Sequence, residues 1–116
     1  MYGLPKDADL RFLKGAELLQ LCVGCHEVIA NFSDDISITI HCSFVHSAAT
    51  RASPSDLPAA AAPLLSLVGK KILSVSHDTT GRLELSFSNG EVLTLFDDSK
   101  EYESYTISRG NELTVV

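Results

Sequence analysis

Two stretches of the sequence alternate strictly between apolar and polar residues, and this period of two constrains the fold more than any other feature. Residues 36–42 read Ile-Ser-Ile-Thr-Ile-His-Cys, and residues 83–88 read Leu-Glu-Leu-Ser-Phe-Ser. Successive side chains of a strand point to opposite faces of a sheet, so each stretch predicts a strand with one buried face. Half-buried strands of this kind are typical of antiparallel sheets.

The dipeptide Asn89-Gly90 follows the second stretch and marks a hairpin turn. A loop of three residues, with Gly90 left-handed in a bulge, pairs Leu85 with Leu93. A loop of two residues would instead place Leu93 opposite the polar Ser86. We predict the three-residue loop because it keeps the apolar faces together. Further strands are expected over residues 28–32, 72–76, 102–108 and 112–116.

The order of apolar turn, glycine, strand, polar turn and strand occurs twice, which predicts an internal duplication. Aligning Gly24 with Gly69 gives the two halves an offset of 45 residues. Little helix is expected beyond a helix over 9–21, with Asp9 as its N-cap, and a short one over 63–67. We therefore expect an α+β fold, mainly antiparallel β-sheet of roll or sandwich type, built from two related β-hairpin units with one or two short helices.

The length of 116 residues suffices for one hydrophobic core and is too short for two. Residues 47–62 are dominated by Ala, Ser, Thr and Pro, and they predict a flexible connection between the halves of a single domain spanning 1–116. No apolar run approaches the ~18 residues that span a bilayer. The N-terminal residues do not resemble a secretory leader, so we expect a cytoplasmic protein with reduced thiols and no membrane partner.

The chain carries 15 acidic and 9 basic side chains, which gives a net charge of −6. This balance disfavours binding to nucleic acid, which depends on Lys and Arg displacing counterions. Residues 76–104 contain seven acids and two bases, so this segment carries five of the six negative charges. Such a charge run is most often a solvated surface; its functional interpretation is a docking surface for a basic partner.

The sequence Cys22-Val-Gly-Cys25-His26 matches the signature of c-type haem attachment. Haem is disfavoured because no leader is recognised and no internal methionine could serve as the second axial ligand. A zinc site could use Cys22 and Cys25 with His41 or Cys42, although adjacent residues on a strand point to opposite faces. The simplest interpretation makes Cys22 and Cys42 small core residues and Cys25 a half-buried thiol, so no metal or cofactor is expected.

No phosphate-binding loop, nucleophile elbow or paired-carboxylate motif occurs in the sequence. The four histidines do not form an evident catalytic set, and the adjacent acids at 34–35 and 97–98 are typical of turns. We therefore expect that the chain is not an enzyme. An active site formed between subunits would escape this reasoning.

Residues 97–105 contain the side chains that we expect to contact a protein partner. The acids would steer and hold a basic partner, and a tyrosine would supply an apolar anchor. The alternative for Tyr105 is packing at the edge of the core, with Glu103 accepting a local hydrogen bond. The expected partner-binding residues are Asp97, Asp98, Glu101, Tyr102, Glu103 and Tyr105.

Three motifs of the second half occur together: a glycine-led strand from Gly69, the hairpin Gly-x-Leu-x-Leu-x-Phe-x-Asn-Gly over 81–90, and Tyr-Glu-Ser-Tyr over 102–105. With these motifs, residues 64–108 resemble a group of small bacterial domains of unknown function. The chain has Tyr105 where that group typically has Trp. The resemblance implies a compact, β-rich cytoplasmic domain, and some similar domains accompany bacterial toxin systems and are regarded as immunity proteins.

These observations together favour a non-enzymatic protein-binding domain, of immunity type, that neutralises a basic toxin through its acidic surface. The alternative is a small zinc protein that uses Cys22 and Cys25 with His41 or Cys42. Homodimerisation is a further expectation, because an exposed edge strand invites pairing.

Overall fold

The computed structural model describes residues 9–47, 52, 55, 57–98 and 104–116. In this part of the chain nine strands form two antiparallel sheets. The strands are β1 (Leu18–Val23), β2 (Val28–Phe32), β3 (Ile36–Ile40), β4 (Phe44–His46), β5 (Ile72–His77), β6 (Leu83–Phe87), β7 (Val92–Leu95), β8 (Tyr105–Arg109) and β9 (Glu112–Val115).

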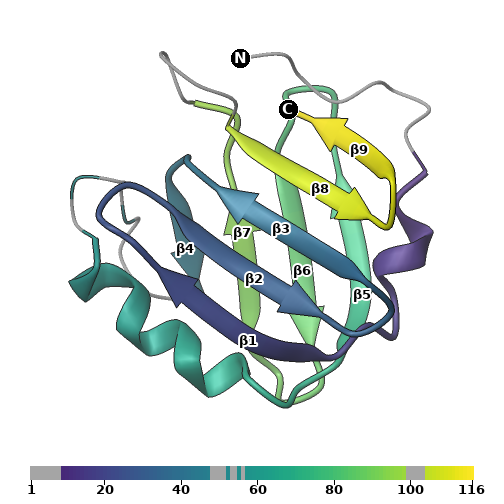
Figure 1. Cartoon of the computed structure of the whole chain (residues 1–116), viewed down its shortest axis with the longest axis horizontal. Helices are drawn as coiled ribbons and strands as arrows, with labels where there is room; N and C mark the ends of the chain where they lie inside the picture. The colour runs from purple at the N-terminus through teal and green to yellow at the C-terminus, as the bar shows by residue number, and fades with distance from the viewer. Residues whose placement is uncertain (1–8, 48–51, 53–54, 56, 99–103) are drawn as a thin grey trace.

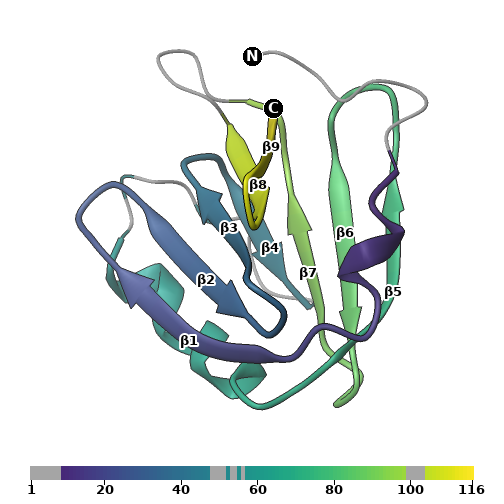
Figure 2. The same ribbon diagram turned by 45° about the vertical axis from the view of Figure 1, so that its right-hand side comes forward.

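One sheet has the strand order β1-β2-β3-β8-β9, and the other has the order β4-β7-β6-β5. The five-stranded sheet lies in front of the four-stranded sheet in Figure 1, and the turned view in Figure 2 shows the two layers facing each other. Two 3-10 helices complete the described fold, η1 (Arg11–Leu13) beside β5 and η3 (Ala59–Leu67) beside β1. The prediction of a mainly antiparallel β fold with little helix is confirmed, and no helix among the described residues is long and apolar enough to cross a membrane.

The alternating stretches form the strands that the sequence predicts. Every second side chain of β2, β3 and β6 is buried, and the residues between them are half-buried. The predicted hairpin register is also confirmed, since Leu85 lies opposite Leu93. Gly90 adopts φ of +87°, and its N–H donates to the carbonyl of Phe87 at 3.0 Å, which closes the three-residue loop. A left-handed residue at this position favours glycine.

The helix predicted over residues 9–21 is wrong. Its described part contains only the single turn η1, after which Gly15 takes φ of +90° and donates its N–H to the carbonyl of Ile72 at 2.7 Å. The chain then enters β1 at Leu18, which pairs with β2. Pairing with β2 makes residues 18–23 a strand, so tertiary contacts override the helix propensity of this segment.

The flexible connection predicted over residues 47–62 ends earlier than expected. Residues 59–62 belong to η3, which begins four residues before the predicted helix start at Pro63 and buries Ala61 against the core. Within the same connection Ala52 forms a bridge with Phe44 in both directions, at 2.8 and 3.0 Å. The rest of the connection, apart from 47, 55, 57 and 58, lies outside the described residues.

An internal duplication exists, but its offset is 54 residues at the start of each unit. Gly15 and Gly69 occupy equivalent positions: the first donates its N–H to Ile72 and the second donates to Leu18, both at 2.7 Å. These residues precede β1 and β5, so β1-β2-β3 corresponds to β5-β6-β7. The predicted alignment of Gly24 with Gly69 is therefore wrong by one strand. Gly24 lies in the β1–β2 turn and does not have a positive φ.

The two units meet at a corner with approximate two-fold symmetry. Its centre is the bridge between Glu17 and Lys71, which are themselves equivalent positions. Glu17 accepts a hydrogen bond from the N–H of Ser33 at 2.9 Å, and Lys71 accepts the matching bond from Ser88 at 2.8 Å. In each case the serine hydroxyl accepts the return bond from the backbone N–H. The hydrogen bonds that join the two units at this corner, between residues 15–18 and residues 69–72, are made by backbone groups.

The fourth strand of each unit is exchanged between the sheets. β4 follows β3 but pairs with β7, whereas β8 follows β7 but pairs with β3. Each sheet therefore contains strands from both halves of the chain, so neither half can complete its sheet alone. β9 is added at the edge of one sheet and has no counterpart in the other.

Candidate functional site

Two of the predicted partner-binding acids, Asp97 and Asp98, follow β7 and accept hydrogen bonds from serines in neighbouring connections. Asp98 accepts hydrogen bonds from the backbone N–H of Ser43, at 3.0 Å, and from the hydroxyl of the same residue. Asp97 accepts a hydrogen bond from the hydroxyl of the buried Ser104 at 2.6 Å. Both acids are half-buried, so their carboxylates are held in place by the fold while still reaching solvent.

Tyr105 is fully buried, and its hydroxyl donates a 2.6 Å hydrogen bond to the carbonyl of Gly81. Burial raises the pKa of this phenol, and the neighbouring Cys42 and Asp97 add to the effect. Tyr105 is therefore not available at the surface as an anchor for a partner, and its burial agrees with the alternative of packing against the core. The other expected contacts, at 101–103, lie outside the described residues.

The structure brings a third acid to the same end of the molecule. Asp78 lies in the β5–β6 turn, where it accepts hydrogen bonds from Thr80 and pairs with Arg82 at 3.3 Å. These hydrogen bonds lower the pKa of Asp78. Asp78 and Asp97 both raise the pKa of the buried Tyr105 phenol through their charge, so both carboxylates lie in its neighbourhood. We call Asp78, Asp97 and Asp98 the acidic end; in Figure 1 these turns lie along the upper edge of the four-stranded sheet.

The residues of the expected zinc site do not converge. Cys22 and Cys25 are exposed, whereas Cys42 is buried and burial raises the pKa of its thiol to about 12. A thiol held neutral in this way is a poor metal ligand, because the ligand form is the thiolate. His41 instead contacts Glu27, with Nε2 and Oε2 2.9 Å apart. Among the described residues no three or more His, Cys, Asp or Glu side chains form a group that could hold a metal ion.

These positions also revise the interpretation of the three cysteines. Cys42 is the small core residue that the sequence predicts. Cys22 is not in the core, and Cys25 is exposed rather than half-buried. Cys22 lies on the outer side of the edge strand β1, where its Sγ is 3.8 Å from the amide nitrogen of Asn31. The adjacent His41 and Cys42 face opposite sides, as expected for neighbours on an extended chain.

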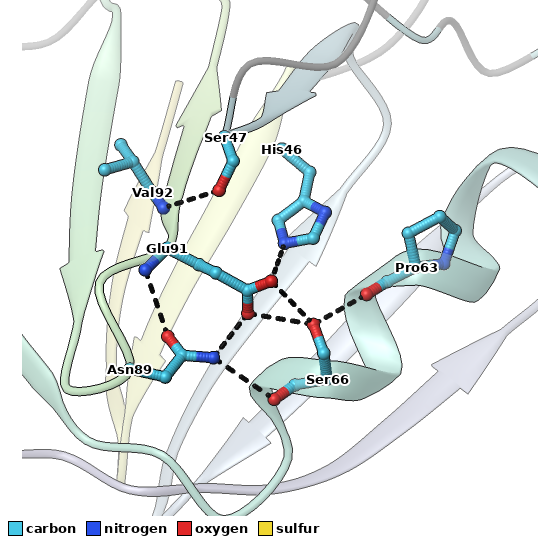
Figure 3. Close-up of polar contacts among 7 residues, drawn as sticks. All are labelled: His46, Ser47, Pro63, Ser66, Asn89, Glu91 and Val92. Carbon is cyan, nitrogen blue, oxygen red and sulfur yellow. Dashed lines mark hydrogen bonds and ion pairs between the residues drawn. The ribbon is translucent and has the colours of Figure 1, made fainter.

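Glu91 is the centre of a polar cluster that sequence reasoning missed (Figure 3). Its carboxylate accepts hydrogen bonds from the hydroxyl of Ser66, at 2.9 and 3.1 Å, and from the side-chain amide of Asn89. Nε2 of His46 lies 3.3 Å from Oε1 of Glu91 and forms an ion pair when the ring is protonated. We call His46, Ser66, Asn89 and Glu91 the Glu91 cluster.

The Glu91 cluster joins three elements that are distant in sequence. Glu91 and Asn89 lie in the β6–β7 hairpin, Ser66 lies in η3, and His46 ends β4. The hydrogen bonds from Ser66 and Asn89, and the nearby His46, lower the pKa of Glu91. No local signal could have identified the cluster, because Asn-Gly-Glu predicts only a turn and the link from Ser66 spans 25 residues.

The Glu91 cluster holds η3 and the end of β4 against the β6–β7 hairpin. A nucleophilic serine needs a base in contact with its hydroxyl. The Ser66 hydroxyl contacts the carboxylate of Glu91 and the carbonyl of Pro63, each at 2.9 Å, and the lowered pKa of Glu91 makes its carboxylate a weak base. The carboxylate stands between the serine and the histidine, so the cluster fastens η3 and β4 onto the hairpin.

A family model described as a family of unknown function (DUF6188) matches residues 11–116. No curated protein matches the chain. No solved structure matches it either.

Proposed function

The chain belongs to the DUF6188 family, and we propose that it is a non-enzymatic protein-binding domain of immunity type that acts in the bacterial cytoplasm. Its partner in this proposal is a basic protein, such as a toxin, that docks on the acidic end. The observation that carries the proposal is the meeting of Asp78, Asp97 and Asp98, from two separate turns, at one end of the molecule. Glu101 and Glu103 follow in sequence after Ser99 and Lys100 and add two acids to this segment of the chain.

Fixed carboxylates suit this role for a physical reason. Charges gathered on one surface steer an oppositely charged partner and raise its rate of association. Asp97 and Asp98 are already held by Ser104 and Ser43, so little side-chain entropy is lost when they bind. Because Tyr105 is buried, Tyr102 takes the role of the apolar anchor in the proposal.

The proposal is tested with two double variants that change the charge equally. E101Q/E103Q removes two charges from the segment that follows the acidic end. D34N/D35N removes two charges from the β2–β3 turn, where both aspartates have positive φ, a conformation that asparagine tolerates. The tagged wild-type chain is used to capture its partner from an extract of the native cells, and the partner is identified by mass spectrometry.

We expect the captured partner to be basic and to bind E101Q/E103Q about three- to tenfold more weakly than wild type at low salt. The D34N/D35N control should bind as wild type does, and the difference should shrink as salt rises. Equal binding by both variants would refute the contribution of Glu101 and Glu103 to the binding surface. If the partner is a toxin, co-expression of this chain should restore growth, and failure to do so removes the immunity assignment.

A further inference from the structure

β9 is an edge strand that the described structure leaves uncovered. Leu113 on this strand is 64% exposed, the largest value among the described large apolar residues. The other three sheet edges differ: β1 is irregular at Leu19 and has η3 beside it, and β5 is irregular at Leu73 and has η1 beside it. β4 is bridged by Ala52. Proteins usually protect sheet edges in such ways, because a bare edge offers unpaired backbone groups.

The hydrogen-bond pattern shows which backbone groups of β9 face outward. Tyr105 and Val116 exchange two hydrogen bonds, at 2.9 and 3.3 Å. Bonded and non-bonded pairs alternate along an antiparallel ladder, so Thr114 bonds to β8 while Leu113 and Val115 do not. The N–H and C=O groups of Leu113 and Val115 therefore point away from the sheet. None of the described residues is hydrogen-bonded to them.

Most of the surface next to this edge is neutral. Two rows of side chains run across all five strands on the outer face of the five-stranded sheet, each row made of residues that lie opposite one another on neighbouring strands. Every side chain in these rows is neutral, even though the chain has a net charge of −6. On β9 itself the charged Glu112 is paired with Arg109 at 3.0 Å. The neutral positions are Gln20, Cys22, Ile29, Asn31, Ser37, Thr39, Thr106, Ser108, Leu113 and Val115.

We propose that β9 pairs antiparallel with β9 of a second copy of this chain and so joins two five-stranded sheets into one continuous sheet. A second copy fits because two acidic molecules can approach here without opposing like charges. The register follows from the outward groups. When Thr114 lies opposite Thr114 of the partner, the outward N–H and C=O groups of Leu113 face those of Val115 in the other copy. The two such pairs form four backbone hydrogen bonds. Each Leu113 then lies opposite Val115 of the other copy, which buries an apolar pair.

The first test measures self-association of the full chain by analytical ultracentrifugation over a range of concentrations. The variant is L113K, because a lysine on an edge strand opposes strand pairing. The matched control is L19K: Leu19 is 54% exposed on the irregular edge of β1. We expect a wild-type dimer, a dissociation constant raised on the order of tenfold by L113K, and no change in L19K. A monomeric wild-type chain, or a dimer equally sensitive to both substitutions, would overturn the proposal.

The second test reads the register directly by disulfide formation under mild oxidation. The C22S/C25S background removes the exposed thiols. In the proposed register the cysteine of T114C lies directly opposite the same cysteine in the other copy. The two form a non-hydrogen-bonded pair, in which the Cβ atoms are close enough for a disulfide. In L113C the two cysteines of the dimer are offset by two residues along the paired strands, so they should not cross-link. Efficient cross-linking of L113C in place of T114C would disprove this register, and cross-linking of neither variant would disprove the β9 interface.

Discussion

Single polar side chains join elements of this fold that are distant in sequence. Glu91 is the best example, because one carboxylate contacts a helix, a hairpin turn and the end of β4. Tyr105 acts similarly inside the core, where its hydroxyl bonds to the carbonyl of Gly81. Both contacts join segments that are far apart in sequence, so they stabilise the arrangement of elements rather than any one element.

Glu91 should make the stability of the protein sensitive to acid. Its pKa is lowered from the ordinary value of 4.5, so the native state favours the carboxylate more than the unfolded state does. That stabilisation is present above about pH 4.5 and is lost as the pH falls through the lower pKa of the native state. We expect the urea midpoint of wild type to fall more steeply between pH 5 and pH 3 than that of E91Q.

The control for this measurement is E112Q, which neutralises an exposed carboxylate with a single ion-pair partner. Its acid profile should follow that of wild type. An E91Q profile that is parallel to wild type over the whole range would show that the Glu91 cluster contributes nothing through charge.

At the scale of elements, the start of each repeated unit depends on a left-handed glycine. Gly15 and Gly69 have φ of +90° and +87°, and space for a Cβ is open at both positions. Alanine would therefore be disfavoured by backbone conformation alone, by about 1–2 kcal/mol at each site. We expect G15A and G69A to reduce the free energy of unfolding by similar amounts in urea denaturation.

The matched control for the repeat is G24A. Gly24 does not have a positive φ, and a Cβ there would meet its nearest atom, the carbonyl oxygen of Glu27, at an ordinary 3.7 Å. It should therefore change stability by less than about 0.5 kcal/mol. A loss in G24A as large as that in G69A would contradict the equivalence of Gly15 and Gly69.

The strands could be predicted because their signal is local. In the alternating stretches each residue type agrees with the face it occupies, and the requirement that the apolar faces stay together selects the three-residue loop at Asn89-Gly90. The helix expected over 9–21 failed because apolar spacing in a short segment fits either a helix or a strand. Pairing of β1 with β2 decided between them.

At the scale of the whole molecule, two buried acids of the core should limit stability in alkali. Burial raises the pKa of Cys42 from 9.0 to about 12, and burial also raises the pKa of Tyr105 above its ordinary 10.0. The unfolded chain loses these protons first, so the stabilisation is complete below about pH 9 and declines as the pH rises toward the native pKa values. Each group contributes a slope of about 1.4 kcal/mol per pH unit within its window.

Urea midpoints measured under reducing conditions at pH 8, 9, 10 and 11 check this prediction. The C42A variant should lose the part of the decline that begins near pH 9 and keep the part that begins near pH 10. Stability that stays constant from pH 8 to pH 11 would be inconsistent with buried, neutral Cys42 and Tyr105.

The sequence by itself determined the alternating strands β3 and β6, the register of the β6–β7 hairpin and the excess of acid in residues 76–104, because each of these depends on residues close together in the chain. Only the tertiary structure decided which strands repeat, that β4 and β8 exchange sheets, and that Tyr105 lies inside while Cys22 lies outside. The Glu91 cluster belongs to the second group. These features depend on contacts between segments that are distant in the sequence. Alternation along a strand indicates that one face is buried, but it does not indicate which element covers that face.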